Sequence, residues 1–375
     1  MTVCIDLSAA AHERAGLGRY AASLAEALLA LDPALTGFVN DLSTSRLRAP
    51  LSALPLRTAG LPRKLWRLRA AVSYFGGPKL DQALAGVSLY HATEHLLPYI
   101  STARSVFTLH DVAYRLYPQF HLWQNRLYLN LMMPRFMARA DAVICVSEAT
   151  RRDAERFYRV PPEKLHVIYE GVEPRFQPAT DAWALEAVRR RYSLPQRFIL
   201  CVCTIEPRKN LTTLLDAYAA LRQRQPEVGL VLAGGRGWLY EDFFTHLRRQ
   251  KLEQVVHLPG YIPDADLPAL MNCAEVFAYP SVFEGFGLPP LEAMACGIPV
   301  ICSAASSLPE VVADAGLLLP AQDPGRWTEA LARLLADPEL HADLRARGLN
   351  RARQFTWARA AEQTQAVYHT VLKNR

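Results

Sequence analysis

The chain has 375 residues, of which 51% are apolar and 21% are charged, and its formal net charge is +6. This length exceeds the roughly 100–200 residues of one domain, and the ordinary balance of apolar and charged residues excludes a disordered or low-complexity protein. The longest apolar runs fall far short of the roughly 20 residues that cross a bilayer, so we expect no membrane span.

The N-terminus and the cysteines bear on the compartment. The chain enters a strand pattern at once, which predicts that no signal peptide is present. The seven cysteines are scattered and lack the C-x-x-C spacing of a metal or redox pair. We therefore expect reduced cysteines in a cytoplasmic protein.

Strand and helix patterns alternate through the first half, which is typical of a parallel sheet covered by helices on both faces. The expected strands are 3–7, 89–91, 105–109, 142–146 and 166–168, and the expected helices are 20–31, 120–139 and 148–158. These patterns predict one doubly wound domain over residues 1–172.

Gly16 and Gly18 follow the first strand after a loop and precede helix 20–31. Glycine lets the backbone approach a phosphate or a sugar closely, so both are candidate ligand contacts. The alternative is that they serve only the turn.

A basic segment lies between Asp41 and Asp81, where no acidic residue occurs. Residues 1–170 hold 20 Lys and Arg against 14 Asp and Glu, whereas residues 171–375 hold 22 of each, so the whole charge excess lies in the first half. Within 57–79 the cations are mixed with Leu, Trp, Val, Tyr and Phe, as in segments that lie on an anionic membrane. A solvated helix or loop whose apolar side packs on its own domain is an equal alternative.

His110 and Asp111 come directly after strand 105–109. Ligands of open parallel sheets bind at the carboxyl ends of the strands, so His110 is a candidate site residue. A single histidine is more often structural.

A second alternation begins after a hinge that we expect within 171–195. The expected strands are 198–203, 229–233, 255–258, 276–278, 299–302 and 316–318, and residues 324–372 are expected to be helical. This predicts a second doubly wound domain over 173–355, and a C-terminal helix in 356–375 that packs back on the first domain. Two such domains facing each other would form a cleft lined by loops from both.

Two cations, Arg208 and Lys209, stand between strand 198–203 and the helix expected over 211–221. Arginine presents a planar fork and lysine a point charge, and both suit phosphate oxygens at a turn from strand to helix. The alternative is a solvated basic turn.

The strongest local pattern is the segment 281–297, in which Glu284 and Glu292 are separated by seven residues. Pro289 and Pro290 suit the first turn of a helix and Gly297 suits its C-terminal cap, so a loop should lead into a helix N-terminus that can hold a diphosphate. The alternative is that Glu284 is a solvated loop acid and that Glu292 is an acid of the first helical turn.

Taken together, these segments resemble the retaining glycosyltransferases of family 4, which have the GT-B fold of two Rossmann-like domains facing across a cleft. The resemblance covers nearly the whole chain. It rests on Glu284 and Glu292, Arg208-Lys209, His110-Asp111, Gly16 to Tyr20, Val146-Ser147-Glu148, Glu170-Gly171-Val172, and Leu258-Pro259-Gly260-Tyr261-Ile262.

The resemblance implies a role for each matching residue. Glu284 would lie by the donor sugar, Glu292 would bind the ribose, Arg208 and Lys209 would neutralise the diphosphate, and the amides of Phe286, Gly287 and Leu288 would hold phosphate and sugar. Gly16 and Gly18 would pack against the donor, His110 would contact the transferred sugar, and the backbone of Tyr261 and Ile262 would edge the base. Members of the family retain the anomeric configuration and need no metal or other cofactor, because protein cations stabilise the departing diphosphate.

Some residues depart from the family pattern. Many relatives have Gly-Arg or Gly-Thr where this chain has Cys203-Thr204, so Arg208 would carry more of the phosphate charge. Relatives commonly have Asn in place of Glu170. Asp264 and Asp266 resemble a metal-binding D-x-D, but their position before the helical run 267–273 favours helix capping.

The resemblance is greatest to mannosyltransferase-like members, so GDP-mannose is the first expected donor and UDP-glucose or another UDP-sugar the second. The expected acceptor is a glycan, or a lipid-linked glycan if residues 57–79 contact the inner face of the cell membrane. A nucleotide-sugar-binding protein without turnover, and a phosphorylase or epimerase on the same fold, are the alternatives. No nucleic-acid recognition module is present.

Overall fold

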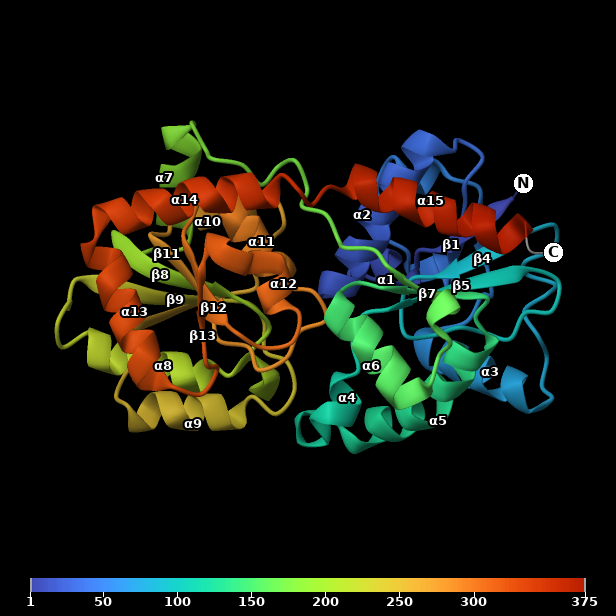
Figure 1. Cartoon of the computed structure of the whole chain (residues 1–375), viewed down its shortest axis with the longest axis horizontal. Coiled ribbons are helices and arrows are strands. Elements are labelled where there is room, and N and C mark those ends of the chain that lie inside the picture. The colour runs from blue at the N-terminus through green and yellow to red at the C-terminus, as the bar shows by residue number, and fades with distance from the viewer. Residues whose placement is uncertain (1, 374–375) are drawn as a thin grey trace. The chain divides into compact units, whose positions relative to one another are not determined.

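The computed structural model describes residues 2–373, which form two compact units (Figure 1). The first unit consists of Met1–Leu116, Trp123–Gly171 and Thr356–Arg375, and the second of Tyr117–Leu122 and Val172–Phe355. The short segment Tyr117–Leu122 therefore groups with the second unit although the chain on both sides of it belongs to the first.

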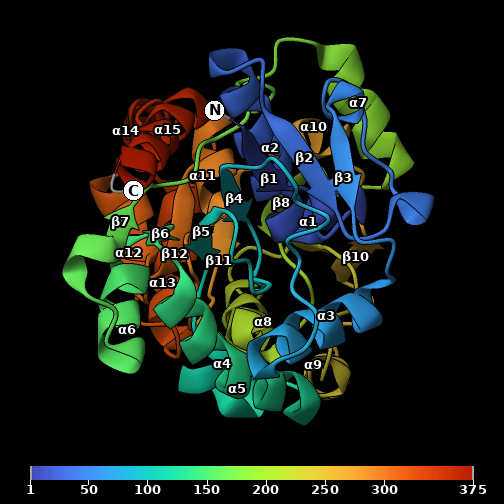
Figure 2. The same ribbon diagram turned by 90° about the vertical axis from the view of Figure 1, so that its right-hand side faces the viewer.

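The first unit contains a parallel sheet of seven strands in the order β3-β2-β1-β4-β5-β6-β7, which Figure 2 shows from right to left. The strands are β1 Val3–Asp6, β2 Thr36–Val39, β3 Leu56–Thr58, β4 Leu89–Ala92, β5 Arg104–Leu109, β6 Ala142–Cys145 and β7 Leu165–Val167. All five expected strands are confirmed. The sequence prediction lacked β2 and β3, which are short, and β3 is a half-exposed edge strand without a continuous apolar pattern.

Helices cover this sheet. They are α1 Ser8–Ala11, α2 Ala15–Leu31, α3 Arg63–Val72, α4 Ala113–Leu116, α5 Trp123–Arg139, α6 Glu148–Tyr158 and α15 Trp357–Lys373. Helix α6 has the predicted bounds, because the Ser147 hydroxyl accepts a hydrogen bond from the Thr150 amide at 3.1 Å and caps it. Helix α2 begins five residues before the expected start, so Gly16 and Gly18 lie in its first turn rather than in a loop.

The second unit contains a parallel sheet of six strands in the order β10-β9-β8-β11-β12-β13. The strands are β8 Arg197–Val202, β9 Val228–Ala233, β10 Val256–Gly260, β11 Val276–Tyr279, β12 Val300–Ser303 and β13 Leu317–Leu319. Each of the six expected strands is confirmed within two residues at either end. Apolar side chains from both faces of β8, β9, β11 and β12 are buried, as expected for strands covered on both sides.

The helices of the second unit are α7 Ala182–Arg191, α8 Leu211–Leu221, α9 Glu241–Arg249, α10 Leu267–Asn272, α11 Leu288–Ala295, α12 Leu308–Val312, α13 Pro324–Ala336 and α14 Pro338–Ala352. Helix α7 lies inside the segment expected to be a polar hinge, and the Asp181 carboxylate caps it. Among the described residues, no helix is long and apolar enough to cross a bilayer.

The C-terminal helix α15 packs against α2 of the first unit. The backbone at Gly171 and Trp357 approaches so closely that a Cβ on Gly171 would lie 2.2 Å from the Trp357 nitrogen. The chain thus leaves and re-enters the first unit at adjacent points, and glycine at position 171 is required by that approach.

Candidate functional site

A cluster of buried charges forms where β8 and β11 end in the second unit. After β8, residues Pro207–Lys209 form a short 3-10 helix, which places Arg208 and Lys209 side by side. Arg208 Nη1 donates to Glu284 Oε2 at 2.8 Å, and Lys209 Nζ donates to Glu284 Oε1 at 2.6 Å. The structure therefore brings together three residues that the sequence analysis selected from separate motifs.

Two further side chains complete this cluster. Arg208 Nη2 donates to Glu206 Oε1 at 2.7 Å, and Lys209 Nζ donates to the Tyr279 hydroxyl at 2.9 Å. Tyr279 in turn donates to Glu284 Oε1 at 3.0 Å. We call Glu206, Arg208, Lys209, Tyr279 and Glu284 the charge cluster. Its two cations and two carboxylates are almost completely shielded from solvent.

The charge cluster fixes the ionisation of Glu284. Burial alone would raise the pKa of this carboxyl group, but the charges of Arg208 and Lys209 outweigh it and lower the pKa to about 2. Burial raises the pKa of Tyr279 well above its ordinary value, with the charge of Glu284 as a further cause. At neutral pH Glu284 is therefore a carboxylate and Tyr279 a neutral donor.

The loop that carries Glu284 is held by two serine side chains from the turn after β12. Ser306 and Ser307 both donate to the Glu284 carbonyl, at 2.6 and 3.0 Å, and Ser307 also lies 2.7 Å from the Phe286 carbonyl. Gly287 has a φ of +116° at the N-terminus of α11, a conformation that L side chains rarely adopt. Helix α11 then starts at Leu288, as predicted from Pro289 and Pro290.

The two glutamates of this turn are buried. The alternative that Glu284 is a solvated loop acid and Glu292 an acid of the first helical turn is therefore wrong. Glu284 is paired with two cations, and Glu292 is 1% exposed in the interior of α11 rather than in its first turn. Burying a carboxylate is costly unless polar groups surround it. Both glutamate side chains therefore lie in the interior of the second unit rather than at its surface.

Tyr261 and Ile262 follow the end of β10. Tyr261 is 69% exposed, whereas Ile262 is buried. Gly234 directly follows β9 and lies so close to Cys203 that a Cβ would be 1.8 Å from the Cys203 carbonyl oxygen. Position 203, where the chain departs from the family pattern, thus holds a half-buried cysteine whose sulfur lies 3.9 Å from that of Cys201.

In the first unit, Gly16 and Gly18 have different surroundings. A Cβ on Gly18 would lie 2.8 Å from the Ala9 carbonyl oxygen, whereas a Cβ on Gly16 would meet nothing within 4 Å. Gly18 is therefore required for the packing of α2 on α1. Gly16 borders open space, so packing inside the first unit does not explain it.

His110 is buried at the end of β5. Its Nε2 lies 2.8 Å from the Thr93 carbonyl oxygen, which can only accept, so Nε2 carries a proton. Its Nδ1 faces Glu170 Oε1 at 3.6 Å, and the ring of Tyr20 meets it edge-on at 4.6 Å. Glu170, one of the departures from the family pattern, thus lies beside a predicted site residue.

A buried polar chain that the sequence analysis missed supports this histidine. The Tyr368 hydroxyl of α15 lies 2.6 Å from His91 Nδ1, and His91 Nε2 lies 2.8 Å from Thr108 Oγ1. Thr108 Oγ1 lies 3.1 Å from the Tyr20 hydroxyl, whose ring contacts His110. Tyr20 belongs to a segment that carries the family resemblance, but no sequence motif marks Tyr368, His91 or Thr108, which meet it only through the folding of β4, β5, α2 and α15.

The D-x-D segment does not cap a helix with its side chain. Asp266 is the N-terminal cap residue of α10, yet its carboxylate accepts hydrogen bonds from Arg191 and Tyr192 instead of a helix amide. The capping interpretation is wrong for this side chain, because it accepts hydrogen bonds from a cation and a hydroxyl at the C-terminal end of α7 instead. Among the described residues, no three His, Cys, Asp or Glu side chains are grouped as a metal ion would require.

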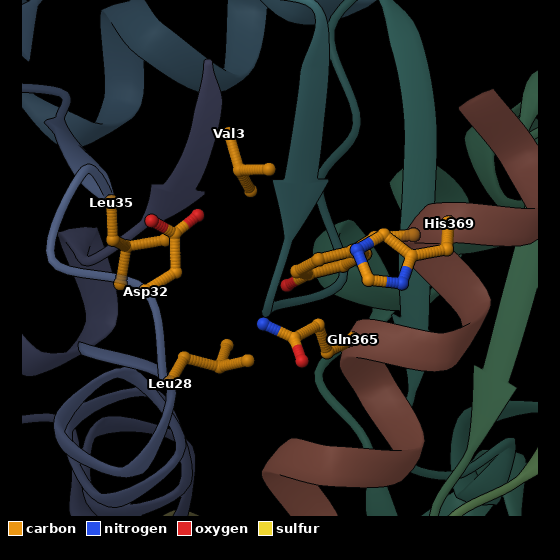
Figure 3. A pocket seen from close by; sticks show the side chains of 7 residues that line it. Val3, Leu28, Asp32, Leu35, Gln365 and His369 are labelled. Atoms are coloured by element: carbon orange, nitrogen blue, oxygen red, sulfur yellow. The ribbon is translucent and has the colours of Figure 1, made fainter. Parts of the chain in front are cut away.

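A small pocket of the first unit adjoins Tyr368, the last residue of the buried polar chain (Figure 3). It is lined by Val3, Leu28, Asp32, Leu35, Gln365, Tyr368 and His369, from β1, the end of α2 and α15. None of the predicted site residues lines it.

Two family models match the chain. The model described as glycosyl transferases group 1 matches residues 187–351, and the model described as glycosyltransferase family 4 matches residues 14–176. The first range contains the charge cluster and Glu292, and the second contains Gly16, Gly18 and His110.

The comparisons with individual proteins agree with these models. O-antigen chain mannosyltransferase B of Escherichia coli is 33% identical over 325 residues, which are 86% of this chain and 81% of that protein. The solved structure of sucrose-phosphate synthase from Thermosynechococcus elongatus covers 100% of both chains with a TM-score of 0.77 at 25% identity. HepE from Anabaena, solved in complex with UDP and glucose, covers 98% of this chain and 99% of its own with a TM-score of 0.74 at 21% identity.

Proposed function

Because this chain belongs to the glycosyltransferases of the group 1 and family 4 models, with the GT-B fold, we propose that it moves a hexose from a nucleotide-sugar to a glycan or lipid-linked acceptor. The observation that carries this proposal is the charge cluster of the second unit. Arg208 and Lys209 are adjacent, largely shielded from solvent and hydrogen-bonded to Glu284 at the carboxyl end of a parallel sheet, where such folds bind nucleotides.

The leaving group explains the need for two buried cations. Cleavage of the donor's glycosidic bond leaves negative charge on a nucleoside diphosphate, and fixed positive charge stabilises that state most when water is excluded. A guanidinium and an ammonium group supply this charge without a metal ion. The proposed reaction is therefore metal-independent.

The remaining donor contacts are carried over from the family pattern. Glu284 would lie by the hexose and Glu292 by the ribose, with the amides of Phe286, Gly287 and Leu288 holding phosphate and sugar. The exposed Tyr261 and the adjoining backbone of Ile262 would edge the base. The turn containing Glu284 is fixed by Ser306 and Ser307, which supports a preorganised role for its backbone.

In the first unit, Gly16 and His110 are the proposed sugar-side residues. Gly16 borders open space, which would allow a ligand to approach the start of α2. His110 is held by Thr93 and Tyr20, so its ring has a fixed orientation. The transfer would proceed with retention on the same face of the sugar, and the leaving phosphate would assist deprotonation of the acceptor.

GDP-mannose is the first proposed donor, because O-antigen chain mannosyltransferase B, which is similar over 86% of this chain, is a mannosyltransferase. A UDP-sugar is the second, since HepE was solved with UDP and glucose. The proposed acceptor is a lipid-linked glycan on the inner face of the cell membrane, with residues 57–79 in peripheral contact with the lipid. The cations of that segment support this location.

Thermal unfolding in EDTA with a panel of nucleoside diphosphates and nucleotide-sugars tests the donor site. A ligand that binds only the folded protein raises Tm in proportion to the logarithm of its concentration over Kd. GDP and GDP-mannose should raise Tm of the wild type, and much less that of Lys209→Ala. An exposed cation of the same unit provides the control, since Arg224→Ala should respond as the wild type does.

Three outcomes separate the alternatives. A response to uridine nucleotides alone would replace GDP-mannose by a UDP-sugar. An equal response in Lys209→Ala would remove the phosphate role of the charge cluster. Binding without turnover on any acceptor would favour the nucleotide-sugar-binding alternative.

A further inference from the structure

Helix α3 of the first unit has one face in the core and another in solvent. Trp66 and Ala70 are buried, and Trp66 packs on Phe38 at a ring distance of 5.2 Å. The opposite face presents Leu65, Leu68 and Val72, followed by Phe75, with exposed fractions of 41% to 59%. One alternative for this segment is that its apolar side packs on its own domain. This holds for the inner face of α3 only, because the four large apolar side chains of the outer face are exposed to solvent.

Helix α5 repeats this arrangement. Trp123, Leu127 and Leu131 are spaced by four residues, so they lie on one face of the helix. Their exposed fractions are 66%, 62% and 46%. The core of the first unit takes up the other face, which includes Met133 and Phe136. Exposed Leu and Trp at this spacing exceed the scattered apolar residues of an ordinary protein surface.

The two helices lie side by side below the sheet in Figure 2. Arg67 joins them, because its Nη2 donates to Asn125 Oδ1 at 3.0 Å while its carbonyl accepts from the Tyr128 hydroxyl at 3.2 Å. The Arg135 guanidinium lies 4.7 Å from the centre of the Phe75 ring. We call the exposed side of this pair the α3–α5 surface, and its apolar residues are Leu65, Leu68, Val72, Phe75, Trp123, Leu127 and Leu131.

The segments that contain the two helices carry positive charge and no negative charge. Neither 42–80 nor 112–140 contains an acidic residue. The cations of the two helices are Arg63, Lys64, Arg67, Arg69, Arg126, Arg135 and Arg139. Burial lowers the pKa of Arg63, and the neighbouring charge of Arg67 lowers it further. The surface is therefore both apolar and strongly basic.

Two cations of α3 also affect a residue near the start of α2. Arg14, which precedes Gly16 by two residues, has a pKa lowered to about 10 by burial and then by the charges of Arg63 and Arg67. Arg14 pairs with Glu94, yet the basic helix is close enough to affect it. The charges of Arg63 and Arg67 thus act on a residue next to the first turn of α2, which contains Gly16 and Gly18 and which we call the glycine turn.

We propose that the α3–α5 surface docks on an anionic phospholipid bilayer, with Trp123, Leu127, Leu65 and Leu68 inserting between headgroups. This proposal rests on the proposed function, because the role of such docking would be to bring the glycine turn to an acceptor held in the lipid. Charge complementarity selects the partner, since lipid phosphates attract Lys and Arg while aliphatic side chains and tryptophan enter the acyl boundary. A nucleic acid would leave the apolar stripes exposed to water.

Vesicle co-sedimentation of the full chain tests the proposal. The probes are vesicles of phosphatidylcholine alone and of phosphatidylcholine mixed with phosphatidylglycerol. The apolar variant carries Trp123→Ser and Leu127→Ser, and the charge variant carries Arg63→Gln, Lys64→Gln and Arg69→Gln. Arg67 is left in place because it joins the two helices. The matched controls are Trp183→Ser, at a residue that is 87% exposed on α7, and a triple Gln replacement of the exposed Arg190, Arg224 and Arg326 of the second unit.

The wild type should bind the anionic vesicles and not the neutral ones, and added salt should weaken binding. The charge variant should bind on the order of a hundredfold more weakly, since each cation near the bilayer contributes about a fivefold factor. The apolar variant should lose at least about tenfold, and both controls should bind as the wild type does.

Absence of binding, equal binding to neutral vesicles, or unchanged binding by both surface variants would overturn the proposal, as would preferential binding of nucleic acid. Unfolding curves show whether each variant is folded. The assay requires no donor and no turnover, so its failure leaves the transferase proposal standing. Failure of the nucleotide panel would likewise leave a positive vesicle result intact.

Discussion

At the residue scale, Glu284 pairs with both of the side chains that we propose bind the diphosphate, Arg208 and Lys209. Its two carboxylate oxygens accept from Arg208 and Lys209 at 2.8 and 2.6 Å, and Glu206 holds the other side of the guanidinium. The formal charges of the cluster therefore cancel. A diphosphate that binds Arg208 and Lys209 must compete with Glu284 for the same hydrogen-bond donors.

This competition predicts opposite effects of Glu284→Gln on stability and on ligand binding. Loss of one carboxylate leaves a buried cation uncompensated and should lower the free energy of unfolding by on the order of 3 kcal/mol. The freed cations should bind a nucleoside diphosphate more tightly, so the ligand-induced rise in Tm should exceed that of the wild type. Transfer activity should fall, because the group proposed to lie beside the hexose has lost its charge.

Glu329→Gln is a suitable control, because Glu329 forms an exposed ion pair with Arg224. Such a pair contributes little, and both Tm and its rise with ligand should stay close to the wild-type values. A smaller ligand-induced rise in Glu284→Gln than in the wild type would show that this carboxylate helps to bind the diphosphate rather than competing with it.

His91 should make the protein sensitive to mild acid. Burial lowers its pKa to about 3, with the neighbouring His110 as a further cause, while the unfolded chain titrates at about 6.5. Below about pH 6.5 the unfolded state binds a proton that the folded state excludes. The free energy of unfolding should therefore decrease by about 1.4 kcal/mol for each unit by which the pH is lowered. Glu284, with a lowered pKa, loses its stabilising effect only at more acidic pH, below about 4.5.

Denaturant unfolding between about pH 7 and 5 measures this slope. His91→Gln should show a slope that is smaller than that of the wild type by up to about 1.4 kcal/mol per pH unit, which corresponds to one proton. Equal slopes in His91→Gln and the wild type would mean that the buried ring takes up a proton in the folded protein.

At the scale of elements, the start of α2 contains one glycine that packing requires, Gly18, and one that packing does not explain, Gly16. Gly18→Ala should destabilise the protein by about 1–3 kcal/mol, because the new Cβ would lie 2.8 Å from a backbone oxygen of α1. Gly16→Ala meets open space and favours a helix, so stability should stay equal or rise by up to about 1 kcal/mol. If a ligand approaches Gly16, activity should fall in this stable variant. Unchanged activity in Gly16→Ala, measured beside its unfolding curve, would assign the glycine to the turn alone.

Most elements could be predicted from the sequence because buried parallel strands read as continuous apolar runs. The strand 198–203 and the helix 148–158 are examples, the latter fixed by a local cap at Ser147. The edge strand β3 could not be found, because its pairing with β2 depends on the rest of the sheet. Helix α7 was hidden in a polar segment, since Asp181 starts it and only Val188 is buried.

The candidate site could be predicted in part. Arg208, Lys209 and Glu284 were found from motifs at strand ends, but their mutual hydrogen bonds join positions about 75 residues apart and require the tertiary fold. The buried chain from Tyr368 to Tyr20 connects four elements and leaves no local pattern. Sequence periodicity reports which face of an element is buried, not which polar groups meet there.

At the scale of the whole molecule, charge is divided between the two units. The net positive charge of the sequence lies in residues 1–170, which include both helices of the α3–α5 surface, whereas residues 171–375 are balanced. The balanced half contains the cation pair proposed to hold the donor, and there the positive charge is matched locally by Glu206 and Glu284. The two halves are thus suited to different anionic partners, a lipid surface and a nucleoside diphosphate.

The central claim is that the chain transfers a hexose from a nucleotide-sugar. The most direct test follows GDP-mannose, and UDP-glucose in a parallel sample, by proton NMR in EDTA with a lipid extract as acceptor. The account predicts that nucleoside diphosphate appears together with an α-linked hexose in the lipid fraction, and that Lys209→Ala forms far less of both. A folded protein that releases no nucleoside diphosphate from either donor, or that gives a β-linked product, would contradict it.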